Sequence, residues 1–446
     1  MIKSKKSFFI LNSTQKKRIK NNIFSGFSSD MTQVFSQIFF APLMIFFWGI
    51  ENFGIWLFLL SIPNIFLIFS INFTSASINE ITMFNSQGNY KKANEAFQNS
   101  IVFTSLNIIF FTLLILLFYL FNDVEFSVLK NIKISELIVI LPLLILSIYL
   151  NLFGSLFITG LQSHGKHYIG FNISNATDLL SKVSIVFSGI FFNSLVYPAI
   201  IYFIYAAIRF FLNFYFFLLH RKNIFFSLRL VSKKSLIRLF KLSIGHTAHV
   251  ASNLINHSGI IFILGIFYSP YIVGYIATVK TLFYFFPIRF FTKLNHIIYY
   301  EIASLYAKKK FILIKNNFFN YVKFIFLLVV LFITLALIIG PFIYNLWLNN
   351  KYEMSFVLLL LIVFDAAFFT MRHSITAIFG AINKNMLLGI LELILILIVV
   401  TLFYLNSYFG YSYLTGFTII LLGSVINLIF SFILLLLFFK RKNKFF

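Results

Sequence analysis

Apolar residues occur along this chain in runs of about 20, separated by short polar clusters. A run of this length, as an α-helix, crosses the roughly 30 Å hydrocarbon core of a bilayer. A barrel strand would instead alternate apolar and polar positions over about ten residues. The pattern therefore predicts an all-α integral membrane protein with twelve spans, at 24–48, 53–78, 97–121, 137–161, 171–193, 196–219, 242–267, 272–293, 319–344, 354–381, 386–406 and 414–439.

The composition of the chain agrees with this pattern. Of the 446 residues, 60% are hydrophobic and 11% are charged, against about 25% charged in a soluble domain. These values exclude a soluble enzyme, a disordered chain and a fibrous repeat. The chain has no cysteine, which excludes disulfides, zinc–thiolate sites and iron–sulfur clusters, and we expect no cofactor. A polar stretch without a cleavage site follows the basic N-terminal residues, so we interpret the first span as retained rather than as a signal peptide.

The basic residues between the spans are distributed very unevenly. The odd-numbered gaps hold only Lys130, Lys133 and Lys351, whereas both tails and the even-numbered gaps are rich in Lys and Arg. By the positive-inside rule, both termini are predicted to lie in the cytoplasm, and the protein in the bacterial cytoplasmic (inner) membrane. The net charge of +24 is thus a topology signal, which argues against a nucleic-acid partner and allows contact with anionic membrane lipids.

The chain divides into two groups of six predicted spans. The longest polar connection is 220–241, a basic and amphipathic stretch expected to lie along the membrane surface. It separates a predicted N-terminal bundle, 1–219, from a predicted C-terminal bundle, 242–446. Glycine-containing segments after the first and seventh spans, and at the ends of the fourth and tenth, recur at offsets near 216 and 220 residues. We interpret this as a parallel duplication with a site between the halves.

Ionisable residues inside the spans are the main candidates for function. Each costs about 2.5–3.5 kcal/mol on insertion scales, so several together indicate an internal polar pathway. Asp30 and Glu392 lie near the ends of their spans, where headgroups or water are within reach. The full set is Asp30, Asp178, Lys182, Arg209, Lys280, Arg289, Lys293, Asp365, Arg372 and Glu392.

Helical spacing groups several of these residues into stripes. Asp178 and Lys182 are four apart and can pair directly, while Lys280 and Arg289 lie on opposite faces of a straight helix. Histidines of the seventh span are too far apart along the helix for a shared metal site. Arginine stays charged and presents a fork of donors that suits phosphate oxygens. Arg209, Arg289 and Arg372 are therefore the strongest functional candidates.

Short motifs along the whole chain resemble a known family. They are W-G-I-E-N-F-G-I-W at 48–56, G-N-Y-K-K-A at 88–93, F-I-T-G-L-Q-S-H-G-K at 157–166, Y-I-V-G-Y at 271–275, N-L-W-L at 345–348 and A-I-F-G-A-I-N-K at 377–384. The chain resembles the Wzx-type polysaccharide (O-antigen) flippases of the multidrug/oligosaccharidyl-lipid/polysaccharide exporter superfamily. One departure is Ser70-Ile71-Asn72 at the end of the second span, where many such flippases carry Asp and Gly.

The resemblance implies a fold, a substrate and partners. Two six-helix bundles would enclose a central cavity and move undecaprenyl-diphosphate-linked oligosaccharide units to the outer leaflet by alternating access, for O-antigen (lipopolysaccharide) or another surface polysaccharide. A polymerase and a chain-length regulator of the same pathway would be partners. Cations for the diphosphate would come from Arg209, Arg289, Arg372 and Lys280. Sugar contacts would come from Asn172, Asn175, Tyr202, Tyr205, Asn253 and Asn256. Candidates for a coupling ion are Asp30, Asp178 and Asp365, and the sequence does not choose between protons, sodium ions and no coupling.

Two other functions remain open on the sequence. A cation-coupled drug exporter of the same superfamily would share the topology, but intramembrane arginines would repel a cationic drug. A membrane polysaccharide polymerase or glycosyltransferase usually needs a long outer loop with acid or base groups, and the longest predicted outer loop is only about 122–136. We therefore expect a transporter and not an enzyme.

Overall fold

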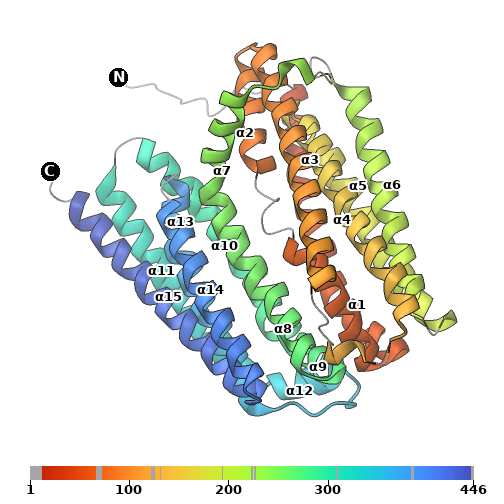
Figure 1. Ribbon diagram of the computed structural model, residues 1–446. Coiled ribbons are helices and arrows are strands. Elements are labelled where there is room, and N and C mark those ends of the chain that lie inside the picture. The colour runs from red at the N-terminus through yellow and green to blue at the C-terminus, as the bar shows by residue number, and fades with distance from the viewer. Residues whose placement is uncertain are drawn as a thin grey trace.

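The computed structural model describes residues 13–66, 73–121, 126–130, 132–192, 194–221, 225, 228–307, 310–382 and 386–442. These residues are almost entirely helical, and the helices form two groups that lie side by side (Figure 1). Both ends of the chain lie at the same end of the molecule, whereas α9 and α12 lie at the opposite end. The prediction of an all-α membrane protein is confirmed.

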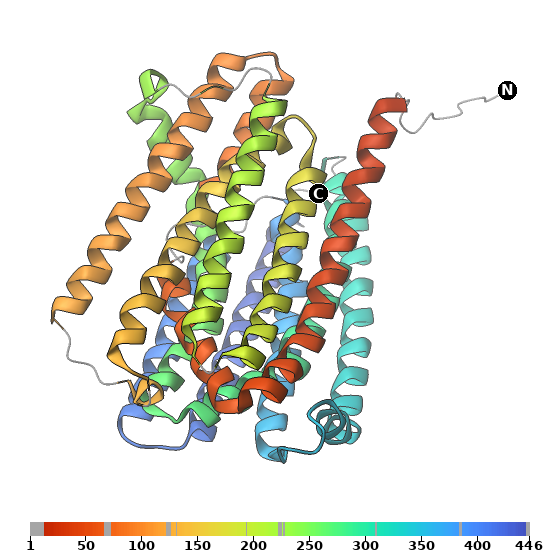
Figure 2. The same cartoon turned by 90° about the vertical axis from the view of Figure 1, so that its right-hand side faces the viewer.

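The first group, which we call the N-lobe, contains α1 to α6. Its helices are α1 (Ser13–Phe66), α2 (Phe73–Ser86), α3 (Tyr90–Phe121), α4 (Ile134–Ser163), α5 (His167–Phe191) and α6 (Val196–His220). A short 3₁₀ turn, Ser127–Leu129, lies between α3 and α4. In the side view, the first part of α1 stands at the edge of this group (Figure 2).

The second group, the C-lobe, contains α7 to α15. Its helices are α7 (Lys233–Leu254), α8 (Ile260–Phe267), α9 (Pro270–Lys280), α10 (Phe286–Ala307), α11 (Phe311–Ile338), α12 (Gly340–Trp347), α13 (Phe356–Ala381), α14 (Met386–Tyr408) and α15 (Tyr413–Lys442). A π-helical turn, Ile255–Gly259, joins α7 to α8, and a second, Thr281–Phe285, joins α9 to α10. Each pair is therefore one long helix with a π-bulge, a feature that often marks functional sites.

Ten helical stretches in the described residues are long and apolar enough to cross a membrane. The sequence predicted twelve spans, and the difference from ten has two causes. The first two predicted spans, 24–48 and 53–78, share the single element α1, which breaks only at Gly49, where φ is +79°; residues 67–72 lie outside the described range. The fifth, 171–193, is the helix α5, whose polar stripe leaves it less apolar than the others. The chain is a multi-pass membrane protein.

Glycines allow the two lobes to approach closely at the end opposite the termini. A Cβ atom on Gly54 of α1 would lie 2.1 Å from the carbonyl oxygen of Pro270, and one on Gly274 would lie 2.3 Å from that of Ile50. Such distances leave no room for any side chain, so the backbones of α1 and α9 are in direct contact. We call this contact the glycine seam. It joins two of the motifs that the sequence singled out, at 48–56 and 271–275.

A second contact across the lobes involves a proline. Pro42 has no N–H, so the carbonyl of Ile38 one turn earlier lacks its helical donor. Trp347, at the end of α12, donates its indole N–H to this carbonyl at 2.6 Å. Beyond α12, Lys351 places its ammonium 4.9 Å from the centre of the Phe46 ring. Because α12 and its following loop cover α1, the N- and C-lobes are closed against each other at this end.

Candidate functional site

The polar stripe of α5 meets the polar face of α6 in the N-lobe. Arg209 of α6 forms a salt bridge with Asp178 of α5 and donates its Nε–H to Thr177 at 2.8 Å. Asp178 keeps 44% of its side chain exposed and Arg209 18%. The pair is therefore held by neighbours, and both side chains are still partly exposed. The direct pairing of Asp178 with Lys182 that their spacing suggested is not formed, because Arg209 binds the carboxylate.

Two cations from opposite lobes bind neighbouring positions on α1. Lys182 of α5 donates to Ser36 at 2.8 Å, and Arg289 of α10 donates to the amide oxygen of Gln33, also at 2.8 Å. Ser36 in turn donates to the backbone carbonyl of Gln33 at 3.1 Å. Residues three apart lie on one helical face, so Lys182 and Arg289 reach the same side of α1. We call this set, with Arg209 and Asp178, the α1 cation site.

The α1 cation site has a net positive charge. Lys182 is close enough to Arg209, Arg289 and Asp178 to interact electrostatically with all three. Three positive charges and one negative charge leave a net charge of +2 among these described side chains. Asp30 lies on the same helix, but its side chain is outside the described residues. A cluster of fixed cations at partly exposed positions between two lobes is suited to bind an anion with several oxygen acceptors.

Arg372, the third arginine that the sequence selected, lies in a different place. Its guanidinium is 2.6 Å from Glu392, whose other oxygen is 2.6 Å from Nδ1 of His249. Arg372 is 4% and Glu392 2% exposed, and the guanidinium also lies 4.7 Å from the Phe369 ring centre. This corrects the expectation that Glu392 reaches headgroups or water. Because α7, α13 and α14 enclose it, Glu392 instead neutralises Arg372 inside the C-lobe.

Lys280 and Asp365 are also buried within the C-lobe. Lys280 is 2% exposed, and its ammonium lies 5.0 Å from the ring centre of Tyr284. Asp365 accepts a hydrogen bond from Ser424 and interacts electrostatically with Lys280. The π-bulge between Lys280 and Arg289 separates their environments, since Lys280 is buried and Arg289 faces α1. His257 is exposed and interacts electrostatically with both cations.

The residues predicted to contact sugars fall into two places. Tyr202, Tyr205 and Asn175 lie on α5 and α6 near Arg209, where the Tyr205 hydroxyl is 3.1 Å from Ser184 and Tyr202 packs edge-on against Trp56. Asn172, on the same helix as Asn175, is exposed.

Asn253 and Asn256 instead line a small cavity of about 40 Å³ inside the C-lobe, next to Arg372 and Glu392. Asn256 donates to the hydroxyl of Tyr284 at 3.0 Å. The cavity is large enough for about one water molecule. These two amides therefore lie apart from the α1 cation site.

Within the described residues, no group of three or more His, Asp or Glu side chains is arranged to hold a metal ion. The sequence had selected the cations individually but missed the partners that orient them. Ser36, in the first predicted span, was not distinguished from other helical serines. Nothing in the spacing linked His249 to Glu392, which lie 143 positions apart.

No protein-family model matches this sequence, and no curated protein is significantly similar to it. Solved structures are similar in fold at low identity. A multidrug resistance MATE family transporter of the MOP superfamily, in an inward-facing conformation, has a TM-score of 0.63 at 12% identity, over 93% of this chain and 96% of that one. The lipid II flippase MurJ, in an inward closed conformation, has a TM-score of 0.61 at 15% identity, over 93% of this chain and 86% of that one. This chain therefore has the fold of these two-lobed helical transporters.

Proposed function

We propose that this protein moves a polyprenyl-diphosphate-linked oligosaccharide across the cytoplasmic membrane by alternating access, as one step in the synthesis of a surface polysaccharide. The observation that carries this proposal is the α1 cation site. Lys182 and Arg209 of the N-lobe and Arg289 of the C-lobe lie close together at membrane depth, where fixed charges are costly without a function. A diphosphate supplies negative charge and many acceptor oxygens, which complement a net charge of +2.

The surroundings of the site also suit a glycan carrier. Tyr202, Tyr205 and Asn175 offer aromatic faces and an amide for sugar hydroxyls. The lipid tail would remain in the bilayer during transfer. The fold neighbours include both a multidrug transporter and a lipid II flippase, so the fold supports a transporter and the charge of the site favours the anionic lipid. The uneven basic residues support cytoplasmic termini, which places the glycine seam at the outer face.

A cationic drug is the alternative cargo, and the net charge of the α1 cation site disfavours it. A polymerase or glycosyltransferase would need a nucleophile or a general base beside an acceptor site. Asp178 is bound by Arg209 and Asp365 by Ser424, so neither carboxylate is positioned as such a base. The same two contacts affect the proposal that Asp178 or Asp365 binds a coupling ion. An ion at Asp178 would have to displace Arg209, and an ion at Asp365 would have to displace Ser424.

The proposal is tested with Lys182→Ala and Arg289→Ala, expressed from a plasmid in a strain that lacks the gene. Loss of one charge-assisted hydrogen bond to phosphate costs about 1.5–3 kcal/mol, so we expect each variant to lower surface polysaccharide roughly tenfold or more. Lipid-linked repeat units should accumulate on the inner leaflet. Lys323→Ala, an exposed lysine of α11, is the matched control and should export normally.

Immunoblots of membranes must show equal amounts of all variants. Normal polysaccharide in both Lys182→Ala and Arg289→Ala would exclude the site. Unchanged glycans together with accumulation of cationic dyes in the deletion strain would assign the protein to drug export instead.

A further inference from the structure

The connection between the two lobes is fixed to the N-lobe by buried amides. We call the segment from Phe225 to Phe240 the strap; residues 226 and 227 of it lie outside the described range. Asn94 of α3 accepts from the backbone N–H of Phe225 at 2.9 Å, and Gln98 donates to the carbonyl of the same residue. The next residue of α3, Asn99, accepts from the backbone N–H of Ser232 at 3.1 Å. These side chains replace the backbone partners that an extended segment otherwise lacks.

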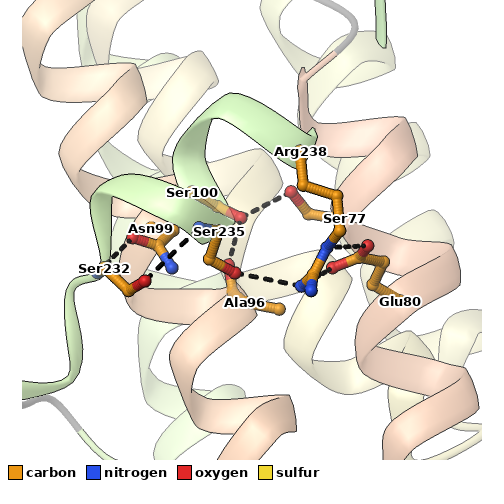
Figure 3. Close-up of polar contacts among 8 residues, drawn as sticks. All are labelled: Ser77, Glu80, Ala96, Asn99, Ser100, Ser232, Ser235 and Arg238. Atoms are coloured by element: carbon orange, nitrogen blue, oxygen red, sulfur yellow. Dashed lines mark hydrogen bonds and ion pairs between the residues drawn. The ribbon is translucent and has the colours of Figure 1, made fainter. Parts of the chain in front are cut away.

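The first turn of α7 is fixed to the N-lobe as well. Ser232 caps α7 by accepting from the N–H of Ser235 at 3.3 Å. Arg238 donates from Nε and Nη2 to the two oxygens of Glu80, both at 2.9 Å (Figure 3). Glu80 is buried, and Arg238 also contacts Ser235. The described residues of the strap are therefore bound on one face to α2 and α3.

The opposite face of the strap combines exposed basic and exposed apolar side chains. Phe225 and Ile237 are 50% and 48% exposed, and Phe240, whose ring also contacts Phe103 of α3, is 51% exposed. The exposed basic residues are Arg229, Lys233 and Lys234. Among the described residues, none of these three cations has an acidic partner within ion-pair distance, whereas Arg238 is fully engaged by Glu80. The strap thus presents three uncompensated cations beside three apolar side chains, at the end of the molecule that carries both termini.

We infer that this face of the strap is a docking surface for the headgroups of anionic membrane lipids. An amphipathic segment of this kind lies in the interface, with its apolar side chains among the acyl chains and its cations at the phosphates. Each Lys or Arg near an anionic surface contributes about 1 kcal/mol to the attraction. Because the strap is held by Asn94, Gln98, Asn99 and Glu80, the surface exists before lipid binds, and no ordering of the segment is required.

The absence of cysteine from the chain makes a direct measurement possible. Ile237→Cys would carry a bimane fluorophore in the full-length protein, reconstituted in nanodiscs, and this labelled protein is the parent for the charge variants of the test. Quenching by dibrominated phosphatidylglycerol would be compared with quenching by dibrominated phosphatidylcholine at equal mole fraction. A preference of about 1 kcal/mol or more corresponds to at least about fivefold stronger apparent binding of the anionic lipid. Raising the salt concentration from about 50 mM to about 500 mM should reduce this preference, because the charges are exposed.

The variant Arg229→Gln/Lys233→Gln/Lys234→Gln should remove the preference. The control Lys310→Gln/Lys315→Gln/Lys323→Gln changes the same charge on exposed positions of the C-lobe and should keep it. Equal quenching by both lipids in the parent, or a preference insensitive to salt, would overturn the inference. Equal loss in both triple variants would also overturn it, since that result would show a general effect of charge.

Displacement of the lipid by soluble pyrophosphate would assign the surface to a soluble anion. If the strap variant fails to fold, the inference is still tested by comparing the two brominated lipids, and by varying the salt concentration, with the labelled parent.

Discussion

At the scale of the residue, burial and pairing separate the arginines that the sequence treated as equal. Arg289 donates to the amide oxygen of Gln33 across the lobes and stays partly exposed. Arg372 is enclosed with Glu392, and removal of one partner leaves the other buried without its ion pair. Such a loss costs about 3–5 kcal/mol, whereas replacement of both partners by apolar residues is often neutral or stabilising.

Glu392→Gln should therefore lower the thermal stability of the detergent-purified protein strongly. The double variant Arg372→Met/Glu392→Leu should unfold at a temperature near or above that of the parent. Glu301→Gln, which changes an exposed carboxylate bonded to Asn317, should shift stability by no more than about 0.5 kcal/mol. A Glu392→Gln protein as stable as the parent but without transport would instead place Arg372 in substrate binding.

His167 lies at the start of α5, on the cytoplasmic side in the proposed topology, and should make the stability of the folded protein depend on pH. Burial lowers the pKa of His167 from 6.5 to about 4, and the ring nitrogen Nε2 lies 3.0 Å from the amide nitrogen of Gln162. The folded state therefore binds fewer protons than the unfolded state between these values. Its contribution to stability is present above pH 6.5 and is lost as the pH falls toward 4.

We expect the melting temperature of the parent to fall as the pH is lowered from 7 to 5. The melting temperature of His167→Asn should fall less over the same interval. Thermal unfolding of both proteins in one buffer series measures the difference. Identical slopes would show that His167 does not titrate differently on folding.

At the scale of the element, α1 depends on a donor from outside its own helix. Trp347→Phe keeps the aromatic ring but removes the N–H that satisfies the carbonyl of Ile38. A buried acceptor without a partner costs about 1–3 kcal/mol. Pro42→Ala would supply a helical N–H to the same carbonyl, so the cost of Trp347→Phe should shrink in that background. A double-mutant cycle of unfolding free energies measures this coupling, and additive effects of the two substitutions would contradict the assigned role of Trp347.

The predicted elements agree with the observed ones most closely in the C-terminal part of the chain. The predicted spans 354–381, 386–406 and 414–439 correspond to Phe356–Ala381, Met386–Tyr408 and Tyr413–Lys442, because uninterrupted apolar runs set helix length directly. Agreement is weaker at α1 and α7. Gly49 alone divides α1, and α7 begins at Lys233, inside the stretch predicted as a linker, because Ser232 caps the helix and α2 and α3 bind its first turn.

At the scale of the whole molecule, the glycine seam sets which end is closed. A methyl group on Gly54 would meet a backbone carbonyl, which cannot rotate away, so the lobes would have to separate there. Overpacking of this kind costs about 1–3 kcal/mol, which raises the ratio of open to closed states by roughly 5- to 150-fold.

Gly54→Ala should therefore increase the labelling rate of Tyr352→Cys by a membrane-impermeant maleimide, since Tyr352 lies beside Ile50 at this end. Gly259→Ala is the control, because a Cβ there would meet only Ile255 at 3.5 Å, an ordinary contact. An unchanged labelling rate in Gly54→Ala would mean that the seam does not limit opening.

The membrane environment, the helical class and the approximate length of most helices could be predicted from the sequence alone. These properties follow from the amount and spacing of apolar residues, which are local. The sequence also located the charges that the bilayer makes costly, Lys182, Arg209, Arg289, Lys280, Asp365 and Arg372 among them. Which of these charges meet could not be predicted in this way, because pairing depends on contacts between helices far apart in the chain. The packing of the helices pairs Glu392 with Arg372 and Asp178 with Arg209. It also brings Lys182 and Arg289 to one face of α1. Among the described residues, the cations of the α1 cation site therefore lie partly exposed between the lobes.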